Sequence, residues 1–274
     1  MLIEKLFDLR GKVVVISGGS GFIGSEISCA LAEIGCRVAL LYNNSIPNDE
    51  TIKRLNRSKS DFEIYKCDVT NREDIIECKN SVFDKFGDID ILINCAGGNH
   101  PDSTTSDKLN FFNIPADAFN WVSELNMMGT VFSCQVFGEV FSKNKKGTIL
   151  NISSMAGLRP LTKIPAYSSS KAAVNNFTKW LSVHMATNYS EKIRVNAIAP
   201  GFLLGKQNRY LLIDEKTGKY TDRGKKIICN TPMNKFGEPK ELISTVVWLL
   251  SPSSNFITGV VVPVDGGFNA FGGV

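Results

Sequence analysis

Residues 13–24, VVVISGGSGFIG, run from an apolar β-branched segment through a glycine-rich turn into a stretch of helical spacing. Glycine permits a tight turn and lets the backbone approach a pyrophosphate closely, and the helix that follows supplies free N–H groups and the positive end of its dipole. This strand–turn–helix order is the context that a dinucleotide site requires. We therefore expect a dinucleotide to contact Ser17, Gly18, Ser20, Gly21, Phe22, Ile23 and Gly24.

Similar apolar runs recur along the chain, and stretches of helical spacing separate them. The runs are residues 12–17, 37–42, 62–67, 90–94, 147–153, 193–199 and 259–264, and the helical stretches are 21–35, 71–86, 115–142, 165–188 and 238–251. Strands that are apolar throughout and alternate with helices are typical of a parallel sheet covered on both faces. With no Pro/Gly/Ser-rich linker, the pattern predicts a single-domain α/β fold over residues 1–274, a Rossmann-type doubly wound parallel sheet of about seven strands.

Two long irregular segments interrupt this alternation. Residues 97–116 follow the fourth expected strand, and residues 202–236 follow the sixth. Ligands of open α/β sheets bind beyond the carboxyl ends of the strands, so these segments and residues 155–166 should form the substrate pocket. The segment 202–236 is polar and loop-like, and a long insertion at this place predicts a substrate lid.

Composition narrows the class of protein. The formal charge of +4 is mild and the lysines are scattered, which argues against nucleic acid as a partner. No apolar run approaches the ~20 residues of a membrane span, and the first twelve residues lack the apolar core of a signal peptide. Seven cysteines without CxxC spacing indicate reduced thiols and no zinc site. We expect a soluble cytoplasmic protein with a small-molecule substrate, no metal and no membrane partner.

The residues after the second expected strand decide between NAD and NADP. An acid there binds the ribose 2′-hydroxyl, whereas an arginine accepts a 2′-phosphate. This chain carries Tyr42 and Asn43, followed by Asn44, in the stretch LLYNNSIPN. Neither an acid nor an arginine is present, and an asparagine side chain hydrogen-bonds either ribose form. The sequence leaves the cofactor as NAD or NADP.

The segment PAYSSSKAAV, residues 165–174, places Tyr167 one helical turn before Lys171. Side chains at positions i and i+4 of a helix lie on one face. A lysine near a tyrosine favours the phenolate and lowers the pKa of the tyrosine, which would make Tyr167 a proton donor and acceptor near neutral pH. The alternative is an incidental pair on a surface helix.

Seven motifs in order resemble the short-chain dehydrogenase/reductase family over about residues 9–271. They are SGGSGFIG (17–24), CDV (67–69), NCAGG (94–98), LNMMGT (125–130), NISSMAG (151–157), the Tyr167–Lys171 pair and APG (199–201). Within the family, AGGNHPDSTT, TPMNKFG and GVVVPVDGGFNAFGGV look like the D-mannonate oxidoreductase (fructuronate reductase) group. Two positions depart from the family pattern: Phe22 stands where glycine is usual, and Gly205 where a threonine that contacts the cofactor is usual.

The resemblance implies a catalytic tetrad of Asn126, Ser154, Tyr167 and Lys171. Tyr167 would exchange a proton with the substrate oxygen, and Ser154 would polarise the carbonyl. Lys171 would lower the pKa of Tyr167 and hold the nicotinamide ribose, and Asn126 would anchor a water that relays protons to Lys171. Taken singly, Ser154 is equally well a turn residue, and Asn126 equally well bonds its own helix backbone.

The resemblance also implies the remaining contacts. Further cofactor contacts would come from Asp68, Val69, Asn94, Ala96, Gly97, Pro200, Gly201 and Phe202. A sugar-acid substrate needs a cation for its carboxylate and polar groups for its hydroxyls. The candidates are Arg159, Lys163 and Arg209 for the carboxylate, and Asn99, His100 and Asn208 for the hydroxyls. For each of them a solvated loop residue is the alternative. Family members also suggest a homotetramer or a homodimer.

These observations favour an NAD(P)-dependent oxidoreductase that transfers a hydride between nicotinamide and a sugar-acid carbonyl or alcohol, with D-fructuronate and D-mannonate as the best guess. A second interpretation keeps the chemistry and changes the substrate to another polyol, a gluconate-like or uronate-derived keto acid, or an acyl-carrier ketone. A third is a non-catalytic dinucleotide sensor, against which the intact tetrad argues.

Overall fold

The seven expected strands form one parallel sheet. The computed structural model describes residues 2–205 and 208–273 of the chain. The strands lie in the order β3-β2-β1-β4-β5-β6-β7, and every pairing is parallel. Their bounds are β1 (Val13–Ser17), β2 (Arg37–Tyr42), β3 (Phe62–Lys66), β4 (Ile91–Asn94), β5 (Gly147–Ile152), β6 (Ile193–Pro200) and β7 (Val261–Val264). Each begins and ends within two residues of the range expected from the sequence, so the doubly wound fold is confirmed.

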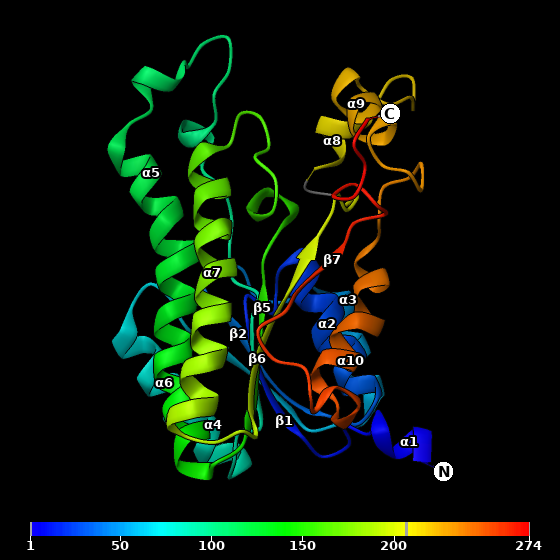
Figure 1. The fold of residues 1–274 in the computed structure, drawn as a ribbon. Helices are drawn as coiled ribbons and strands as arrows, with labels where there is room; N and C mark the ends of the chain where they lie inside the picture. Colours follow the sequence, from blue (N-terminus) through cyan, green and yellow to red (C-terminus); the bar gives the residue numbers. More distant parts are fainter. Residues whose placement is uncertain (1, 206–207, 274) are drawn as a thin grey trace.

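Helices cover both faces of this sheet (Figure 1). One face carries α4 (Arg72–Phe86), α5 (Ala116–Ser123), α6 (Gly129–Asn144) and α7 (Pro165–Asn188), and the other carries α2 (Phe22–Glu33), α3 (Asp49–Ser58) and α10 (Ile243–Leu250). Successive residues of a strand point to opposite faces. Accordingly Val13 and Val15 of β1 pack in the core under α4, α6 and α7, whereas Val14 and Ile16 pack in the core under α2 and α10.

Helix α3 was not expected from the sequence. Its ten residues, DETIKRLNRS, are mostly polar, and only Thr51 and Leu55 are buried. Tertiary contacts and a cap stabilise it instead: the Asn48 side chain accepts a hydrogen bond from the Thr51 amide at 2.9 Å. The Arg54 guanidinium binds Glu26 at 2.7 Å and Glu33 at 3.0 Å, which ties α3 to α2. The short N-terminal helix α1 (Leu2–Leu6) was also not expected.

The stretch expected as one helix over 115–142 is interrupted. Helix α5 ends at Ser123, a π-helical turn spans Glu124–Met128, and α6 begins at Gly129. A π turn widens the helix by one residue and often marks a functional site. Asn126 lies inside this turn. Likewise the stretch expected as a helix over 238–251 opens with a 3₁₀ turn at Pro239–Leu242 before α10.

The segment 202–236 is not the loop that its polar sequence suggested, although residues 206–207 lie outside the described part. It contains α8 (Arg209–Leu212) and α9 (Asp222–Cys229), and Ile213 pairs with Tyr220 in a short antiparallel bridge. A separate apolar cluster holds it together, formed by Leu212, Ile213, Ile227, Ile228 and Phe236. Isolated apolar residues in a polar sequence are enough to order this segment above the sheet (Figure 1).

The cysteines are mainly core residues, as expected. Five of them (Cys29, Cys36, Cys67, Cys78 and Cys134) are buried, and Cys229 is exposed. Burial raises the pKa of the Cys36 and Cys134 thiols to about 12, so both stay protonated near neutral pH. Within residues 2–205 and 208–273, no three His, Cys, Asp or Glu side chains gather as a metal site. In the same ranges, no helix has the length and apolar character needed to span a bilayer.

Candidate active site

A cleft of about 600 Å³ opens where β1, β4, β5 and β6 end. The strand order reverses between β1 and β4, and such a switch point leaves a crevice at the carboxyl edge of the sheet. Its lining begins at the glycine-rich turn and extends to Ser154, Tyr167 and Lys171. The whole lining is Gly18, Ser20, Gly21, Phe22, Ile23, Gly24, Asn44, Ser45, Cys95, Ala96, Gly97, Ile152, Ser153, Ser154, Tyr167, Lys171, Pro200, Gly201, Phe202, Leu203 and Asn208.

The glycine-rich turn has a shape that side chains would fill. Gly18 has a left-handed φ of 63°, and a Cβ there would lie 2.7 Å from the backbone nitrogen of Ala96. A Cβ on Gly24 would lie 2.2 Å from the carbonyl oxygen of Gly18. The helix α2 therefore starts directly against the turn, with its first N–H groups facing the cleft. Such a cradle fits the pyrophosphate of a dinucleotide.

Most of the expected cofactor residues line this cleft, and six do not. Ser17, Tyr42, Asn43, Asp68, Val69 and Asn94 lie outside its lining. Ser17 instead supports it, since its hydroxyl accepts hydrogen bonds from the amides of Cys95 at 3.2 Å and Ala96 at 3.3 Å. Asn94 is buried and donates to Asn151 at 2.8 Å, which in turn donates to Thr178. Ser17 and Asn94 therefore support the residues at the base of the cleft.

Near the expected adenine end, the Asp68 side chain is held by its neighbours. Partial burial acts to raise the pKa of Asp68, but hydrogen bonds from Thr70 and Asn43 hold it below its ordinary value. Its carboxylate thus joins the loops after β2 and β3, and its contact with adenine stays a prediction. Asn44 and Ser45 line the cleft in place of Tyr42 and Asn43. Their position after the second strand could have indicated them, since they stand two residues after the predicted pair.

Ser154 and Tyr167 face each other at the inner end of the cleft. The Ser154 oxygen accepts a hydrogen bond from the Ala156 amide at 3.1 Å, which leaves its proton free to donate. Burial raises the pKa of the Tyr167 phenol, and the Ser154 hydroxyl offsets part of this rise. The expected direction, a pKa lowered by Lys171, is therefore wrong for the protein without cofactor. The reason is that desolvation of the buried phenolate is the largest contribution to this pKa.

Lys171 is held beside the tyrosine in a buried position. Its side chain is 4% exposed, and Nζ donates a hydrogen bond to the Ile152 carbonyl at 2.8 Å. Nζ also lies 5.7 Å from the centre of the Tyr167 ring, which is within the range of a cation–π contact. Burial lowers the pKa of Lys171 to about 8. The ammonium therefore changes its charge close to neutral pH.

Asn126 bonds its own helix backbone, which is one of the two roles that the sequence left open, and it also bonds the loop after β4. Its Nδ2 donates to the Val122 carbonyl in its own helix at 2.8 Å and to the Gly98 carbonyl at 2.6 Å, while Oδ1 accepts from the Gly98 amide at 3.2 Å. A Cβ on Gly97 would lie 2.7 Å from Asn126 Oδ1 and 3.2 Å from Lys171 Nζ. The asparagine thus fixes the loop after β4 beside the lysine. The water relay itself stays a prediction.

Three of the six expected substrate residues are used to shape loops. Asn99 donates to Thr104 at 2.8 Å, and His100 Nδ1 accepts from the Asp102 amide at 3.1 Å. Both cap the turn that opens the segment 97–116. Arg159 donates to the Phe271 carbonyl at 2.9 Å and so secures the C-terminal segment. None of the three lines the cleft.

The other three are distributed over different places. Asn208 lines the cleft, with its side chain bonded to the Leu203 carbonyl at 2.7 Å and the Gly205 amide at 2.9 Å. Lys163 lines a separate hollow beneath α9. Arg209 is exposed on α8 and lines neither cavity. The six residues therefore do not come together as one substrate site.

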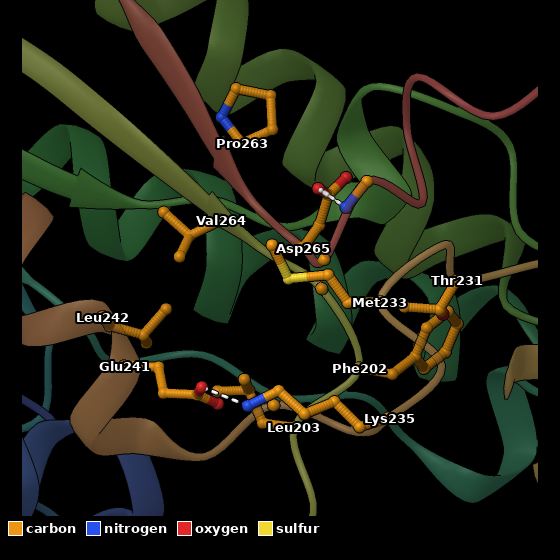
Figure 2. Close-up of a pocket in the computed structure, with 14 residues that line it drawn as sticks. Phe202, Leu203, Thr231, Met233, Lys235, Glu241, Leu242, Pro263, Val264 and Asp265 are labelled. Atoms are coloured by element: carbon orange, nitrogen blue, oxygen red, sulfur yellow. Dashed lines mark hydrogen bonds and ion pairs between the residues drawn. The ribbon is translucent and has the colours of Figure 1, made fainter.

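A further hollow of about 390 Å³ shares Gly201, Phe202 and Leu203 with the lining of the cleft, and Figure 2 shows its lining residues. Its charged groups are satisfied within the protein. Lys235 pairs with Glu241, and the Asp265 carboxylate accepts from the amides of Gly267 at 3.0 Å and Asn269 at 2.7 Å. Figure 2 shows the Lys235–Glu241 pair across its lower edge. These contacts hold the loops after β6 and β7, and they leave none of the charged side chains named here free to react.

The two departures from the family pattern pack against each other. A Cβ on Gly205 would lie 2.6 Å from two atoms of the Phe22 ring. The ring of Phe22 at the start of α2 therefore occupies the space that a side chain at 205 would need. Both residues adjoin the cleft, and Phe22 is part of its lining. A threonine at 205 would therefore clash with the Phe22 ring unless the ring moved.

Gly205→Thr is expected to raise the Kd for NADH by about tenfold, because overpacking against Phe22 distorts the turn. Phe22→Ala/Gly205→Thr should bring the Kd back to within about twofold of wild type. Titration of NADH fluorescence measures both, with Phe22→Ala alone as the control. An equally large loss in the single and double variants would show that the two positions are independent.

Three comparisons place the chain among known proteins. The family model described as enoyl-(acyl carrier protein) reductase matches residues 19–269. An uncharacterized oxidoreductase, UxuB, of Bacillus subtilis is 42% identical over 97% of this chain and 98% of its own length. A 2-dehydro-3-deoxy-D-gluconate 5-dehydrogenase of Dickeya dadantii is 30% identical over 98% of this chain and 100% of its own length.

A solved structure is similar in both sequence and fold. It comes from Haemophilus influenzae, is provisionally assigned as a D-mannonate oxidoreductase, and has NAD bound. It is 41% identical to this chain, the alignment covers 97% of this chain and 98% of the other, and the TM-score is 0.90.

Proposed function

Because the chain belongs to the short-chain dehydrogenase/reductase family and is thus an NAD(P)-dependent oxidoreductase, we propose that it interconverts a sugar keto acid and the corresponding hydroxy acid. D-fructuronate and D-mannonate are the pair we propose. The observation that carries the proposal is the placement of Ser154, Tyr167 and Lys171 at the inner end of a cleft that starts at a glycine-rich turn. A sensor would not need a proton donor and a carbonyl-polarising hydroxyl at that place.

The residues have distinct tasks in this reaction. A bound nicotinamide dinucleotide supplies or accepts the hydride. The Ser154 hydroxyl, whose oxygen already accepts from Ala156, donates a hydrogen bond to the substrate oxygen and polarises the carbonyl. The Tyr167 phenol donates its proton to the same oxygen in reduction and takes it back in oxidation. The Lys171 ammonium stabilises the negative charge on the phenolate that results.

Asn126 holds these residues in position. By bonding both groups of the Gly98 backbone, it fixes the loop that lies beside Lys171. We propose that the polar space next to Gly97 holds a water that returns protons to Lys171 between turnovers. The loops that surround the cleft, among them residues 202–236, would close over the substrate and exclude bulk water.

We propose NAD as the preferred cofactor. Lys171 is the single cation among the described residues that line the cleft, and it lies at the catalytic end. Arg54, the arginine nearest in sequence after β2, is occupied by Glu26 and Glu33. A 2′-phosphate would therefore meet Asn44 and Ser45 without a counter-charge. The NAD-bound relative from Haemophilus influenzae supports the same choice.

The choice of a sugar acid rests on two relatives. One is provisionally assigned to D-mannonate, and the other is a dehydrogenase of 2-dehydro-3-deoxy-D-gluconate. Both substrates are six-carbon acids with several hydroxyls. The second compound is the alternative substrate that we favour if the first fails.

A substrate screen tests the proposal. Purified protein is assayed by absorbance of the reduced nicotinamide. D-fructuronate, D-fructose and an acyl-carrier ketone are each tested with NADH and with NADPH, and 2-dehydro-3-deoxy-D-gluconate, whose 5-hydroxyl is the group to be oxidised, is tested with NAD and with NADP. We expect kcat/KM to be highest for a keto acid and at least about tenfold higher with NADH, as the loss of one charge-assisted contact predicts. Preference for the acyl-carrier ketone would contradict the substrate class, and no turnover at all would favour the sensor.

The protein is also proposed to assemble as a dimer or a tetramer. Trp180 is 56% exposed and Val183 is 63% exposed on α7, and large apolar side chains of this kind often cover one another in an assembly. Light scattering of the protein in solution gives the mass that decides this point.

A further inference from the structure

We propose that a hollow beneath α9 is the subsite for the anionic end of the substrate, and that Lys163, Arg223 and Lys226 bind its carboxylate. We call it the cationic chamber. The inference rests on the proposed function, since it names the residues that would select a keto acid over a neutral ketone. Two of them, Arg223 and Lys226, were not among the residues expected from the sequence.

The cationic chamber is a hollow of about 570 Å³ between α9, the loop before α7 and the C-terminal segment. Arg223, Lys226 and Ile227 of α9 and the residue that caps its C-terminus, Asn230, line it, and their spacing of three and four residues places them on one side of the helix. The rest of its lining is Pro160, Leu161, Thr162, Lys163, Phe202, Asp222 and Phe268. Apolar walls of this kind strengthen the attraction between a bound anion and the cations.

The three cations carry charge that the protein does not neutralise. Among the residues described, Lys163, Arg223 and Lys226 form no ion pair. The one acid of the lining, Asp222, pairs with Lys225 at 3.3 Å. All three side chains are exposed, so solvent screens their mutual repulsion, but no acid of the described chain neutralises them, and together they attract an anion such as a carboxylate.

The backbone of the loop before α7 fixes the position of Lys163 at the chamber. Lys163 has a left-handed φ of 74°, which is uncommon for a lysine. Its carbonyl accepts a hydrogen bond from the Thr105 amide at 2.8 Å, which joins this loop to the segment 97–116. Two of the three segments expected to surround the substrate are thus fixed to each other at the residue that supplies a cation.

The chamber adjoins the catalytic cleft. Phe202 lines both, and its ring meets Phe268 edge to face with centroids 5.2 Å apart. The two rings form the wall between the hollows. A substrate whose carbonyl lies against Ser154 and Tyr167 would therefore extend past Phe202 with its far end toward α9. A six-carbon acid has its carboxylate at the end of such a chain.

Charge-removing variants of α9 test the chamber. Arg223→Gln and Lys226→Gln should each raise KM for D-fructuronate by about 10- to 100-fold while kcat changes by less than about threefold, because the lost contact binds ground state and transition state alike. KM for D-fructose, the neutral ketose of the same length, should not change. The matched control is Lys219→Gln, which removes a charge from an exposed lysine of the same 202–236 segment that does not line the chamber and leaves the Asp222–Lys225 pair intact.

Each other result of these KM measurements would contradict the chamber in a different way. Equal effects on acid and neutral substrates, or an effect of Lys219→Gln as large as that of Arg223→Gln, would overturn the chamber while leaving the oxidoreductase activity in place. If Arg223→Gln and Lys226→Gln raised KM for fructose 6-phosphate more than KM for D-fructuronate, the chamber would be assigned to a phosphate and not to a carboxylate.

If the wild-type protein turns over none of these substrates, the proposed function fails, and a binding measurement still decides about the chamber. D-mannonate is titrated calorimetrically into the protein saturated with NAD. Heat of binding that is lost in Arg223→Gln and kept in Lys219→Gln supports the subsite. Binding that is equal in both, or absent from the wild type, contradicts it.

Discussion

Tyr167→Phe is expected to lower kcat by about a thousandfold or more while the Kd for NADH changes by less than about threefold. General acid–base catalysis by a positioned side chain contributes 10²–10⁴-fold to a rate, and the phenol hydroxyl is the proton donor of the proposed reaction. The substitution removes one oxygen and keeps the ring, so the packing at the start of α7 and the cation–π contact with Lys171 remain.

The pKa of Tyr167 gives this variant a second signature. Since burial raises that pKa, the phenol holds its proton throughout the neutral range in the absence of cofactor. The wild-type rate of oxidation should therefore rise with pH as the phenol loses its proton, and this rise should be absent from the residual rate of Tyr167→Phe. Stopped-flow absorbance over a pH series measures both.

The matched control is Tyr189→Phe, at the exposed C-terminal end of the same helix. It should leave kcat and the pH profile unchanged. A kcat of wild-type size in Tyr167→Phe would contradict the mechanism, and a large loss of NADH binding would show that the tyrosine holds the cofactor instead of the proton.

The sheet was predictable because its central strands are buried on both faces. A run such as VVVIS has four β-branched apolar residues before a serine, is buried throughout, and leads into a turn of glycines, which is typical of such a strand. Helix α3 escaped prediction because its stability comes from the Asn48 cap and from Arg54, not from an apolar stripe. The two short helices of 202–236 escaped for a different reason, since their few apolar residues bury together only after the chain has folded.

The catalytic residues were predictable to the extent that backbone geometry fixes them. Tyr167 and Lys171 share a helix face, and the glycine-rich turn follows from φ values that only glycine adopts easily. The direction of the Tyr167 pKa was not predictable, because spacing along a helix carries no information about desolvation. Nor were Arg223 and Lys226, whose chemistry depends on where a loop-like segment returns to the sheet.

Lys171→Met is the second variant for which we expect a large effect, and its effects on activity and stability have opposite signs. Loss of the ammonium should lower kcat by about a hundredfold or more, since the charge that stabilises the phenolate is gone. The same change removes a buried cation with a single hydrogen bond to Ile152, so the variant should be more stable than the wild type at neutral pH.

The pH dependence of stability follows from the pKa of this lysine. It is about 8 in the folded protein, whereas an unfolded lysine has a pKa of about 10.4. Between these two values the unfolded chain binds more protons than the folded one, so the unfolding free energy of the wild type rises with pH across this window. Relative to Lys171→Met, the gain should reach about 3 kcal/mol by pH 10.5.

Urea denaturation of both proteins without cofactor, at pH values from 7 to 10.5, measures that difference. Lys179→Met, an exposed lysine of the same helix, controls for the loss of one charge. A difference between wild type and Lys171→Met that stays flat over the range would show that the lysine is not desolvated in the folded state. Burial is the cause that lowers the pKa of Lys171 before any ligand binds. Without that desolvation, the reactivity of Lys171 would depend on the bound cofactor and not on the fold.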